Sequence, residues 1–420
     1  MKRLYVVLFG IFSCLFILSC GETIPPNEIR VKIEEGKSPY EAIQEALIKA
    51  TPGKIVVLPE GKFALDRSLS LTVDKVTVRG QGHDKTVLSF KSQKVKDNKK
   101  EGAQGLRVQA NEVVLESFAI EDTQGDAIKV EDAVGITFRK LRIEWTNGPD
   151  KKNGAYGLYP VKSKNILIED CIVKAASDAG VYVGQSEQII VRRNRAELNV
   201  AGIEIENSKY ADVYENIATK NTGGILVFDL PKLPVQGGQS VRVFNNQVFG
   251  NNTENFAPEG AIVGKVPKGV GIMILANDNV EVFKNNIKDN QTANVLIVNY
   301  EFAVGKFKDP KFDPYPEGIY IHDNTFSNGG YDPSGQDFAL LVGLIGKPLP
   351  DVIYDGIVDK KKLKDGKLPP KLRICFKNNG KGTFVNLHAD EKPIPKPNKD
   401  PKPHECELES LKEIKFGAAK

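Results

Sequence analysis

The sequence contains few of the residues that build metal centres. Its 420 residues include five cysteines, four histidines, two methionines and one tryptophan. The histidines, at positions 83, 322, 388 and 404, stand alone, and no Cys-x-x-Cys pair occurs. The chain therefore lacks the ligand spacing of zinc and haem sites. We expect no cofactor, although calcium bound by loop oxygens is compatible with the sequence.

A strong excess of one charge is also missing. Lys and Arg number 58 against 54 Asp and Glu, which gives a formal net charge of +4. This balance argues against nucleic acid as a partner, because such proteins carry a basic surface. Hydrophobic residues make up 40% of the chain and the mean hydropathy is −0.29. These values exclude a wholly disordered chain and a polytopic membrane protein.

The longest apolar run stands at the N-terminus. Two basic residues precede the apolar segment 4–17, which has the pattern of an export signal and is short for a membrane span. The run ends in Leu-Ser-Cys-Gly at 18–21, which resembles the lipobox of bacterial lipoproteins. We expect residues 1–20 to be a lipoprotein signal peptide, Cys20 to carry acyl chains such as palmitate, and 21–37 to be a tether. The resemblance implies a lipid-anchored protein of the bacterial envelope, in the outer membrane and facing the periplasm or the cell surface.

The ordered part of the chain opens with one short helix. Residues 38–41, Ser-Pro-Tyr-Glu, match a capping box with proline at the first helical position. Apolar residues follow at helical spacing, and Pro-Gly at 52–53 ends the segment. Beyond it apolar and polar residues alternate, as in Leu-Ser-Leu-Thr-Val at 69–73. The sequence predicts a capping helix over 38–50 followed by short strands.

A repeat of 22–23 residues then runs down the chain. A strand such as Val-Arg-Val-Phe-Asn-Asn recurs, and its last position is occupied by Leu141, Cys171, Asn194, Asn216, Asn246, Asn285 and Asn324. The longer intervals equal the base period plus insertions, as expected where insertions enter turns. A second strand, with Gly followed by alternating apolar residues, precedes it by thirteen residues in most repeats.

These units are too short to fold alone. A unit of 22 residues without a helix cannot bury its own apolar face, whereas stacked coils share one core. Parallel crossovers are right-handed. We therefore predict an all-β fold, a single-stranded right-handed parallel β-helix over residues 38–380, with about ten coils. The asparagines at one turn should form a ladder of side-chain hydrogen bonds.

The remaining cysteines and the C-terminus fit this scheme. Cys171 falls inside a repeat and is expected to be a small core residue. Cys375 and Cys406 flank a Pro-rich segment, and an oxidising compartment favours a disulfide between them. Residues 381–420, rich in Pro and Lys, are predicted to form an arm or a cap over the last coil.

Two stretches carry a family resemblance. Residues 52–61, Pro-Gly-Lys-Ile-Val-Val-Leu-Pro-Glu-Gly, and 78–86, Val-Arg-Gly-Gln-Gly-His-Asp-Lys-Thr, resemble the first coil of the pectate-lyase-like right-handed parallel β-helix superfamily. Residues 155–300, with Ala-Ser-Asp-Ala-Gly-Val-Tyr-Val-Gly at 176–184, look closer to an exported bacterial β-helix lipoprotein family without a settled activity. If the chain is an enzyme, the resemblance implies a polysaccharide lyase, a glycoside hydrolase or an epimerase. The catalytic motifs of the known hydrolases, lyases and epimerases are missing.

Insertions on both sides of the second strand predict a groove along that sheet. Outward positions of successive coils form one file, which begins with Lys129, Tyr159, Tyr182 and Glu204. Aromatic rings pack against sugar faces, so Tyr159 and Tyr182 are candidate substrate-binding residues, with Lys129 for an acidic group. Glu204 and Glu206 are candidate catalytic carboxyls, with a spacing that suits either stereochemical outcome of glycoside hydrolysis. We expect this polar end to stay open.

Farther along the same file the outward residues are apolar, beginning with Leu226, Met273 and Leu296. An exposed apolar strip of this length needs a cover. The insertions at 229–238, 250–268 and 299–317 belong to these coils, so we expect a secondary core beneath them.

Two classes of function remain compatible with the sequence. In one, the protein binds, and as an enzyme would process, a polysaccharide or envelope glycan in the groove. In the other, it is a non-catalytic periplasmic scaffold or accessory protein for an exported protein partner or metalloenzyme. The fold favours the first class, and the missing motifs favour the second.

Overall fold

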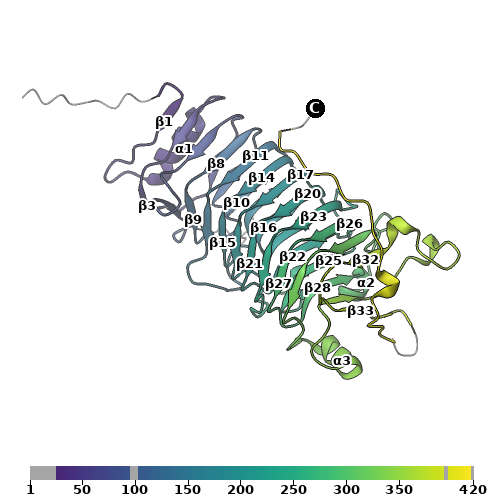
Figure 1. The fold of residues 1–420 in the computed structure, drawn as a ribbon. Helices are drawn as coiled ribbons and strands as arrows, with labels where there is room; N and C mark the ends of the chain where they lie inside the picture. Colours follow the sequence, from purple (N-terminus) through teal and green to yellow (C-terminus); the bar gives the residue numbers. More distant parts are fainter. Residues whose placement is uncertain (1–24, 95–102, 392–395, 418–420) are drawn as a thin grey trace, which may run out of the picture.

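The computed structural model describes residues 25–94, 103–391 and 396–417 of the chain. Within them the chain winds into an elongated stack of coils (Figure 1). The strands pair parallel in three sheets of 12, 11 and 10 strands, and neighbouring strands in most of each sheet are three apart in chain order. Most coils therefore contribute one strand to each sheet, as predicted for a parallel β-helix.

We name the three sheets A, B and C. Sheet A contains β1 Glu28–Arg30, β2 Ile55–Val57, β5 Thr77–Arg79, β8 Val113–Glu116, β11 Val134–Arg139, β14 Lys164–Glu169, β17 Glu187–Arg192, β20 Lys209–Tyr214, β23 Gln239–Phe244, β26 Asp278–Phe283, β29 Ile319–His322 and β32 Ile374–Lys377. Sheet B contains β3 Gly61–Ala64, β6 Thr86–Ser89, β9 Ala119–Glu121, β12 Arg142–Glu144, β15 Ile172–Lys174, β18 Arg195–Glu197, β21 Ile217–Thr219, β24 Gln247–Phe249, β27 Asn286–Lys288 and β30 Thr325–Ser327. Sheet C contains β4 Leu69–Leu71, β7 Leu106–Val108, β10 Ile128–Glu131, β13 Tyr156–Val161, β16 Ala179–Gly184, β19 Ala201–Glu206, β22 Gly223–Phe228, β25 Val270–Leu275, β28 Ala293–Val298, β31 Val352–Tyr354 and β33 Phe384–Asn386.

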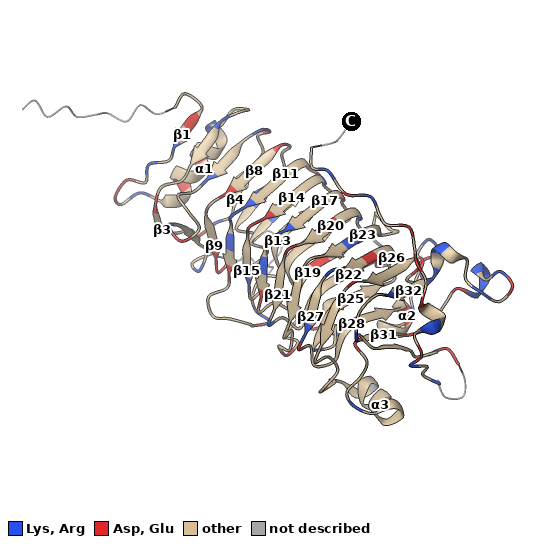
Figure 2. Cartoon of the chain, viewed as in Figure 1, with Lys and Arg blue, Asp and Glu red and all other residues tan. Residues whose placement is uncertain are grey.

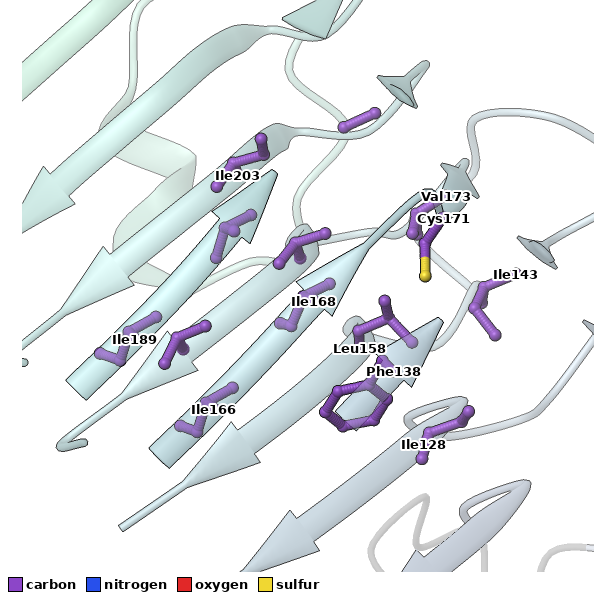
Figure 3. Packing of buried hydrophobic residues seen from close by; sticks show 14 of the residues in the cluster. Ile128, Phe138, Ile143, Leu158, Ile166, Ile168, Cys171, Val173, Ile189 and Ile203 are labelled. Atoms are coloured by element: carbon purple, nitrogen blue, oxygen red, sulfur yellow. The ribbon is translucent and has the colours of Figure 1, made fainter. Parts of the chain in front are cut away.

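The core lies inside the coils, between the three sheets. Alternate residues of each strand point inward, so Ile166 and Ile168 of β14 and Ile203 of β19 are fully buried. Figure 3 shows these side chains packed together with Cys171, which is a free, buried thiol. The shared core explains how units of 22 residues hold together without helices.

The asparagine column forms the predicted ladder. Asn194 Nδ2 donates to Asn216 Oδ1 at 3.0 Å, and Asn216 Nδ2 donates to Asn246 Oδ1 at 3.1 Å. The ladder continues through Asn285 and Asn324 to Asn379. A second ladder, which was not predicted, joins Asn199, Asn221, Asn251 and Asn290 at another turn.

The described helices lie at the two ends of the stack (Figure 1). Helix α1, Pro39–Lys49, covers the first coils and buries Ile43 and Leu47. The side chain of Ser38 makes no capping hydrogen bond, so the capping-box prediction is wrong, although a helix does begin at Pro39. Helices α2, Tyr300–Ala303, and α3, Gln336–Ile345, belong to the last coils. Short 3₁₀ turns occupy Ile262–Lys265, Lys360–Lys362, Pro370–Leu372 and Lys402–His404.

The end of the chain folds back along sheet A. Cys375 and Cys406 form a disulfide with their Cα atoms 5.0 Å apart. Residues 407–417, the C-terminal arm, then run beside β26, β20 and β17 (Figure 1). Backbone N–H groups of the arm donate to coil side chains, from Leu411 to Glu281 at 2.9 Å and from Ile414 to Asp212 at 3.1 Å.

The expected signal peptide at 1–20, with Cys20, lies outside the described residues, as does part of the tether at 21–37. Among the described helices, none is long and apolar enough to cross a membrane. Basic and acidic residues are interspersed along the coils (Figure 2).

Candidate functional site

The predicted file of outward residues crosses sheet C from strand to strand. Lys129 on β10 pairs in register with Tyr159 on β13, and Tyr182 on β16 pairs with Glu204 on β19. The next position along the file is Leu226 on β22, where the file becomes apolar. The parallel register therefore places these side chains on one face of one sheet.

Three tyrosines gather on this face. The ring centroid of Tyr156 lies 4.5 Å from that of Tyr159 and 4.5 Å from that of Tyr182. The centroids of Tyr159 and Tyr182 are 5.0 Å apart. The Tyr159 and Tyr182 rings meet edge to face at 84°. Lys129 Nζ lies 5.3 Å from the Tyr159 ring centroid, within cation–π range.

Because Gly184 has no side chain, the Tyr182 ring can lie over this position of its own strand. A Cβ atom at Gly184 would lie 2.4 Å from the Tyr182 ring. The ring lies over this glycine, and its hydroxyl donates to Glu206 Oε1 in the next coil at 2.6 Å. A glycine at this outward position is therefore part of the site.

The prediction of an open polar end is wrong for three of the five residues. Tyr182, Glu204 and Glu206 are only 5%, 2% and 8% exposed. The cover comes from the insertion at 229–238, which is tied to the neighbouring coil. Asn207 Nδ2 donates to Leu230 O and Val235 O, so this loop is held beside Glu206.

Glu204 and Glu206 form a buried pair. Burial and the charge of Glu206 raise the pKa of Glu204 well above its usual value. Burial raises the pKa of Glu206 to about 7, opposed by hydrogen bonds from Tyr182 and Glu204. A hydrogen bond joins the two carboxyl groups, while Oε2 of Glu204 has no partner among the described residues.

Two aspartates that the sequence reading missed complete the cluster. Asp178 precedes β16 and is half-buried, and burial together with the charge of Glu206 raises its pKa to about 8. The Tyr156 hydroxyl donates to it. Asp126 precedes β10, and burial raises its pKa to about 6, opposed by Lys129 and by the backbone N–H of Tyr156. Each stands at the turn that enters a strand of sheet C, where the alternation of the strand does not tell which way a side chain points.

We call these side chains the tyrosine–carboxyl cluster: Asp126, Lys129, Tyr156, Tyr159, Asp178, Tyr182, Glu204 and Glu206. Its inner end is buried, and its outer end keeps partly exposed surface on the first five. Carboxyl groups with pKa values between about 6 and 8 exchange protons readily near neutral pH, which suits general acid–base chemistry. In the described part of the chain, no group of three or more His, Cys, Asp or Glu side chains could hold a metal ion.

The apolar half of the file is covered as predicted. Leu226, Met273 and Leu296 are at most 4% exposed and belong to a second apolar cluster outside the coils. Leu230, Val263 and Phe312 contribute to it from the three insertions. The loops thus form a secondary core on this face of sheet C.

Comparison with known proteins agrees with this architecture. A family model described as "Right handed beta helix region" matches residues 75–237. The A-module of the mannuronan C-5 epimerase AlgE4 of Azotobacter vinelandii aligns over 76% of this chain and 87% of its own, with 15% identity and a TM-score of 0.51. The chain is a right-handed parallel β-helix. The predicted fold class is thereby confirmed.

Other solved structures are similar at lower scores. A DFA-IIIase from Arthrobacter chlorophenolicus A6 aligns over 78% of this chain and 92% of its own, with 12% identity and a TM-score of 0.47. The catalytic unit of a GH87 alpha-1,3-glucanase from Streptomyces thermodiastaticus aligns over 80% and 52%, with 17% identity and a TM-score of 0.44. No curated protein matches the sequence. At such identities the likeness concerns the fold alone.

Proposed function

We propose that this protein is anchored in the bacterial envelope and that it binds and processes a polysaccharide at the tyrosine–carboxyl cluster. One observation carries the proposal. Three tyrosine rings within 5.0 Å of one another stand beside carboxyl groups whose pKa values lie near neutrality. The structural neighbour with a TM-score of 0.51 is an epimerase of the polysaccharide mannuronan, which supports the substrate class.

The outer end of the cluster supplies the binding surface. Tyr159 is partly exposed and offers an aromatic face to a sugar ring. Lys129 and Asp126 stand beside it and can hydrogen-bond to sugar hydroxyls.

The same end supplies the proton-transfer groups. With a pKa of about 8, Asp178 is largely protonated at pH 7 and can act as an acid. With a pKa of about 6, Asp126 is largely ionised at pH 7 and can act as a base. Glu204 and Glu206 are buried behind Tyr182, so they act as positioning residues in this proposal. This replaces the catalytic role that the sequence suggested for them.

The envelope location rests on the N-terminal sequence. Acylation at Cys20 would tether the protein to the bilayer, in the outer membrane, facing the periplasm or the cell surface. A Cys20→Ser variant should move from the membrane fraction to the soluble periplasmic fraction. Membrane partitioning that is unchanged in this variant would refute the lipid anchor.

A non-catalytic scaffold is the second candidate, favoured by the burial of Glu204 and Glu206 at 2% and 8% exposure. In that case, the carboxyl pair serves only to fix the coils and the insertion at 229–238. The protein would then bind an exported partner protein and show neither glycan retention nor turnover.

A binding and turnover screen separates the two candidates. The mature protein is tested against neutral and uronic-acid polysaccharides by affinity electrophoresis and by product analysis. Tyr159→Ala should weaken retention about tenfold or more, and Asp178→Asn should retain binding but lose most turnover, about a hundredfold. Tyr210→Ala is the matched control, because Tyr210 is 47% exposed and lies on sheet A. Retention and turnover that are equal in all variants would refute the site.

A further inference from the structure

A second cavity lies over the apolar half of sheet C. It encloses about 380 Å³ and is floored by β25, β28 and β31. Met273 pairs in register with Leu296, and Leu296 pairs with Ile353, so the floor is one file of side chains. Phe338 and Leu341 of α3 line the cavity from outside the coil.

The floor is nonpolar to its full depth. Met273 and Leu296 are 4% exposed and Ile353 is fully buried, and all three belong to the second apolar cluster. The volume falls within the range of about 300–1,000 Å³ that is usual for small-molecule sites. Because such a floor offers no hydrogen bond, the part of a ligand that enters must be hydrocarbon.

The rim of the cavity is charged. Lys265 and Lys268 line it together with Glu254, and Lys268 is ion-paired with Glu254. Lys265 is exposed, and its charge leaves these three rim residues with a net positive sum. A ligand that is apolar at one end and anionic at the other therefore complements both parts of the cavity.

Helix α3 forms a wall with a glycine at each end. Gly335 has φ +103° and Gly346 has φ +79°, and no atom lies within 4 Å of the space that a Cβ would occupy at either. Figure 1 shows α3 beside the last coils, and two of its side chains, Leu340 and Leu344, are 69% and 44% exposed. The helix thus presents apolar side chains to the cavity and keeps other apolar side chains exposed to solvent.

We propose that this cavity binds a single-chain amphipathic anion, of which a long-chain fatty acid is the simplest. The acyl chain lies over Met273 and Leu296, and the carboxylate faces Lys265. This site is separate from the tyrosine–carboxyl cluster and does not depend on the polysaccharide proposal.

Binding is tested with the whole mature protein and a fatty acid that carries a dye whose emission rises in nonpolar surroundings. Unlabelled palmitate should displace the dye with one-to-one stoichiometry. Hexadecanol and hexadecylamine, which have the same chain with a neutral and a cationic head, should displace it less well. Lysophosphatidylglycerol is a separate arm that distinguishes a lipid-derived anion from the free acid.

Substitutions in the floor and at the rim of the cavity test where the ligand binds. Leu296→Trp fills the floor and should weaken palmitate binding about tenfold or more. Lys265→Glu should weaken it about twofold to fivefold, as expected for an exposed ion pair. Ile48→Trp is the matched control, because Ile48 is 70% exposed on α1 at the other end of the molecule. If Leu296→Trp fails to fold, Phe302→Glu replaces it, because Phe302 is 50% exposed and lies at the cavity wall.

Two results would overturn the proposal. One is palmitate binding that is absent, or that is equal in the wild type, the cavity variant and Lys265→Glu. The other is displacement of the dye by a nonpolar helical peptide but not by palmitate, which would make the cavity a protein docking site. Displacement by palmitate that is lost only in the cavity and rim variants supports the proposal.

Discussion

The Tyr182 hydroxyl is the contact that joins the aromatic and acidic halves of the cluster. It donates to Glu206 at 2.6 Å inside a region where both side chains are less than 9% exposed. If a buried acceptor loses its hydrogen-bond donor, the free energy of its desolvation is no longer offset. The bond therefore contributes to stability as well as to the arrangement of the site.

Tyr182→Phe should lower the free energy of unfolding by about 1–2 kcal/mol, because it leaves Glu206 without this donor. It should also raise the pKa of Glu206, since the lost hydrogen bond favours the ionised form. Urea unfolding at pH 8 measures the first effect. Tyr210→Phe, at an exposed position, is the control and should be neutral. Equal stability of all three proteins would show that the bond is not formed in solution.

Asp178 should make stability fall as pH rises. Its pKa is about 8 in the folded chain against 3.8 ordinarily, so the unfolded chain ionises first. The stabilising contribution is complete below about pH 4 and is lost as pH rises toward about 8.

Asp178→Asn removes this dependence and still accepts from Tyr156. At pH 8 the variant should be more stable than the wild type by on the order of 1–3 kcal/mol, and at pH 4 the two should be similar. Thermal or urea unfolding from pH 4 to pH 8 measures the effect. The exposed Asp365→Asn serves as the control. If stability changes with pH equally in the wild type and in Asp178→Asn, the raised pKa assigned to Asp178 would be contradicted.

Only part of the cluster could be predicted from the sequence. Tyr159, Tyr182 and Glu204 follow from the period of the repeat, because the parallel register places equivalent positions on one file. Tyr156 and Asp178 stand where the chain enters a strand from a turn, and there the alternation of faces gives no orientation. The burial of Tyr182 was also missed, because the insertion that covers it has no period and its path depends on tertiary contacts.

At the scale of the elements, the asparagine ladder stabilises each turn of the stack. Asn216 Oδ1 accepts from the backbone N–H of Asn194 at 2.9 Å and from its side chain at 3.0 Å. Asn216 Nδ2 donates to Val191 O at 2.9 Å and to Asn246 at 3.1 Å. One side chain thus satisfies two buried backbone groups of the preceding coil and bonds to the asparagine side chain of the next coil.

Asn216→Ala should lower the free energy of unfolding by about 2–4 kcal/mol, because it leaves buried backbone groups without partners. The matched control is Asn286→Ala, whose half-buried side chain donates to Gln247 and should matter by less than about 0.5 kcal/mol. Denaturant unfolding monitored by circular dichroism provides both values. If the free energy of unfolding falls by a similar amount in the two variants, the ladder contributes no more to stability than an ordinary surface hydrogen bond.

Both asparagine ladders could be predicted from the sequence, although only the first one was. The column that ends in Asn324 repeats at one fixed place in the strand pattern, so the sequence displays it directly. The second ladder, from Asn199 to Asn290, lies five residues farther on, beyond the strand pattern that defines the first, and repeats at the same intervals of 22, 30 and 39 residues. The prediction that the Ser38 side chain caps the first helix was wrong, because a local sequence pattern does not fix the rotamer that a cap requires.

For the molecule as a whole, the C-terminal arm connects distant coils. The disulfide at Cys406 fixes its start, and the contacts at Glu281, Asp212 and Asn165 lie on successively earlier strands. Leu411 and Ile414 also line a cavity between the arm and sheet A. The arm therefore bridges several coils that the core alone connects only to their neighbours.

Removing residues 407–420 should lower the free energy of unfolding by about 1–3 kcal/mol, through lost hydrogen bonds and uncovered apolar surface. The disulfide is retained in this variant. Removal of 418–420 alone is the control. Limited proteolysis and thermal unfolding report the effect, and unchanged stability would mean that the arm does not bind sheet A in solution.

The central proposal places a polysaccharide at the tyrosine–carboxyl cluster of sheet C. The most direct test is a crystal structure of Asp178→Asn with a bound oligosaccharide from whichever glycan the screen identifies. We predict that a sugar ring lies against Tyr159, with its hydroxyls bonded to Lys129 and Asp126 and a glycosidic oxygen near position 178. Sugar density confined to another face of the solenoid, with the Tyr159 ring free, would contradict the proposal.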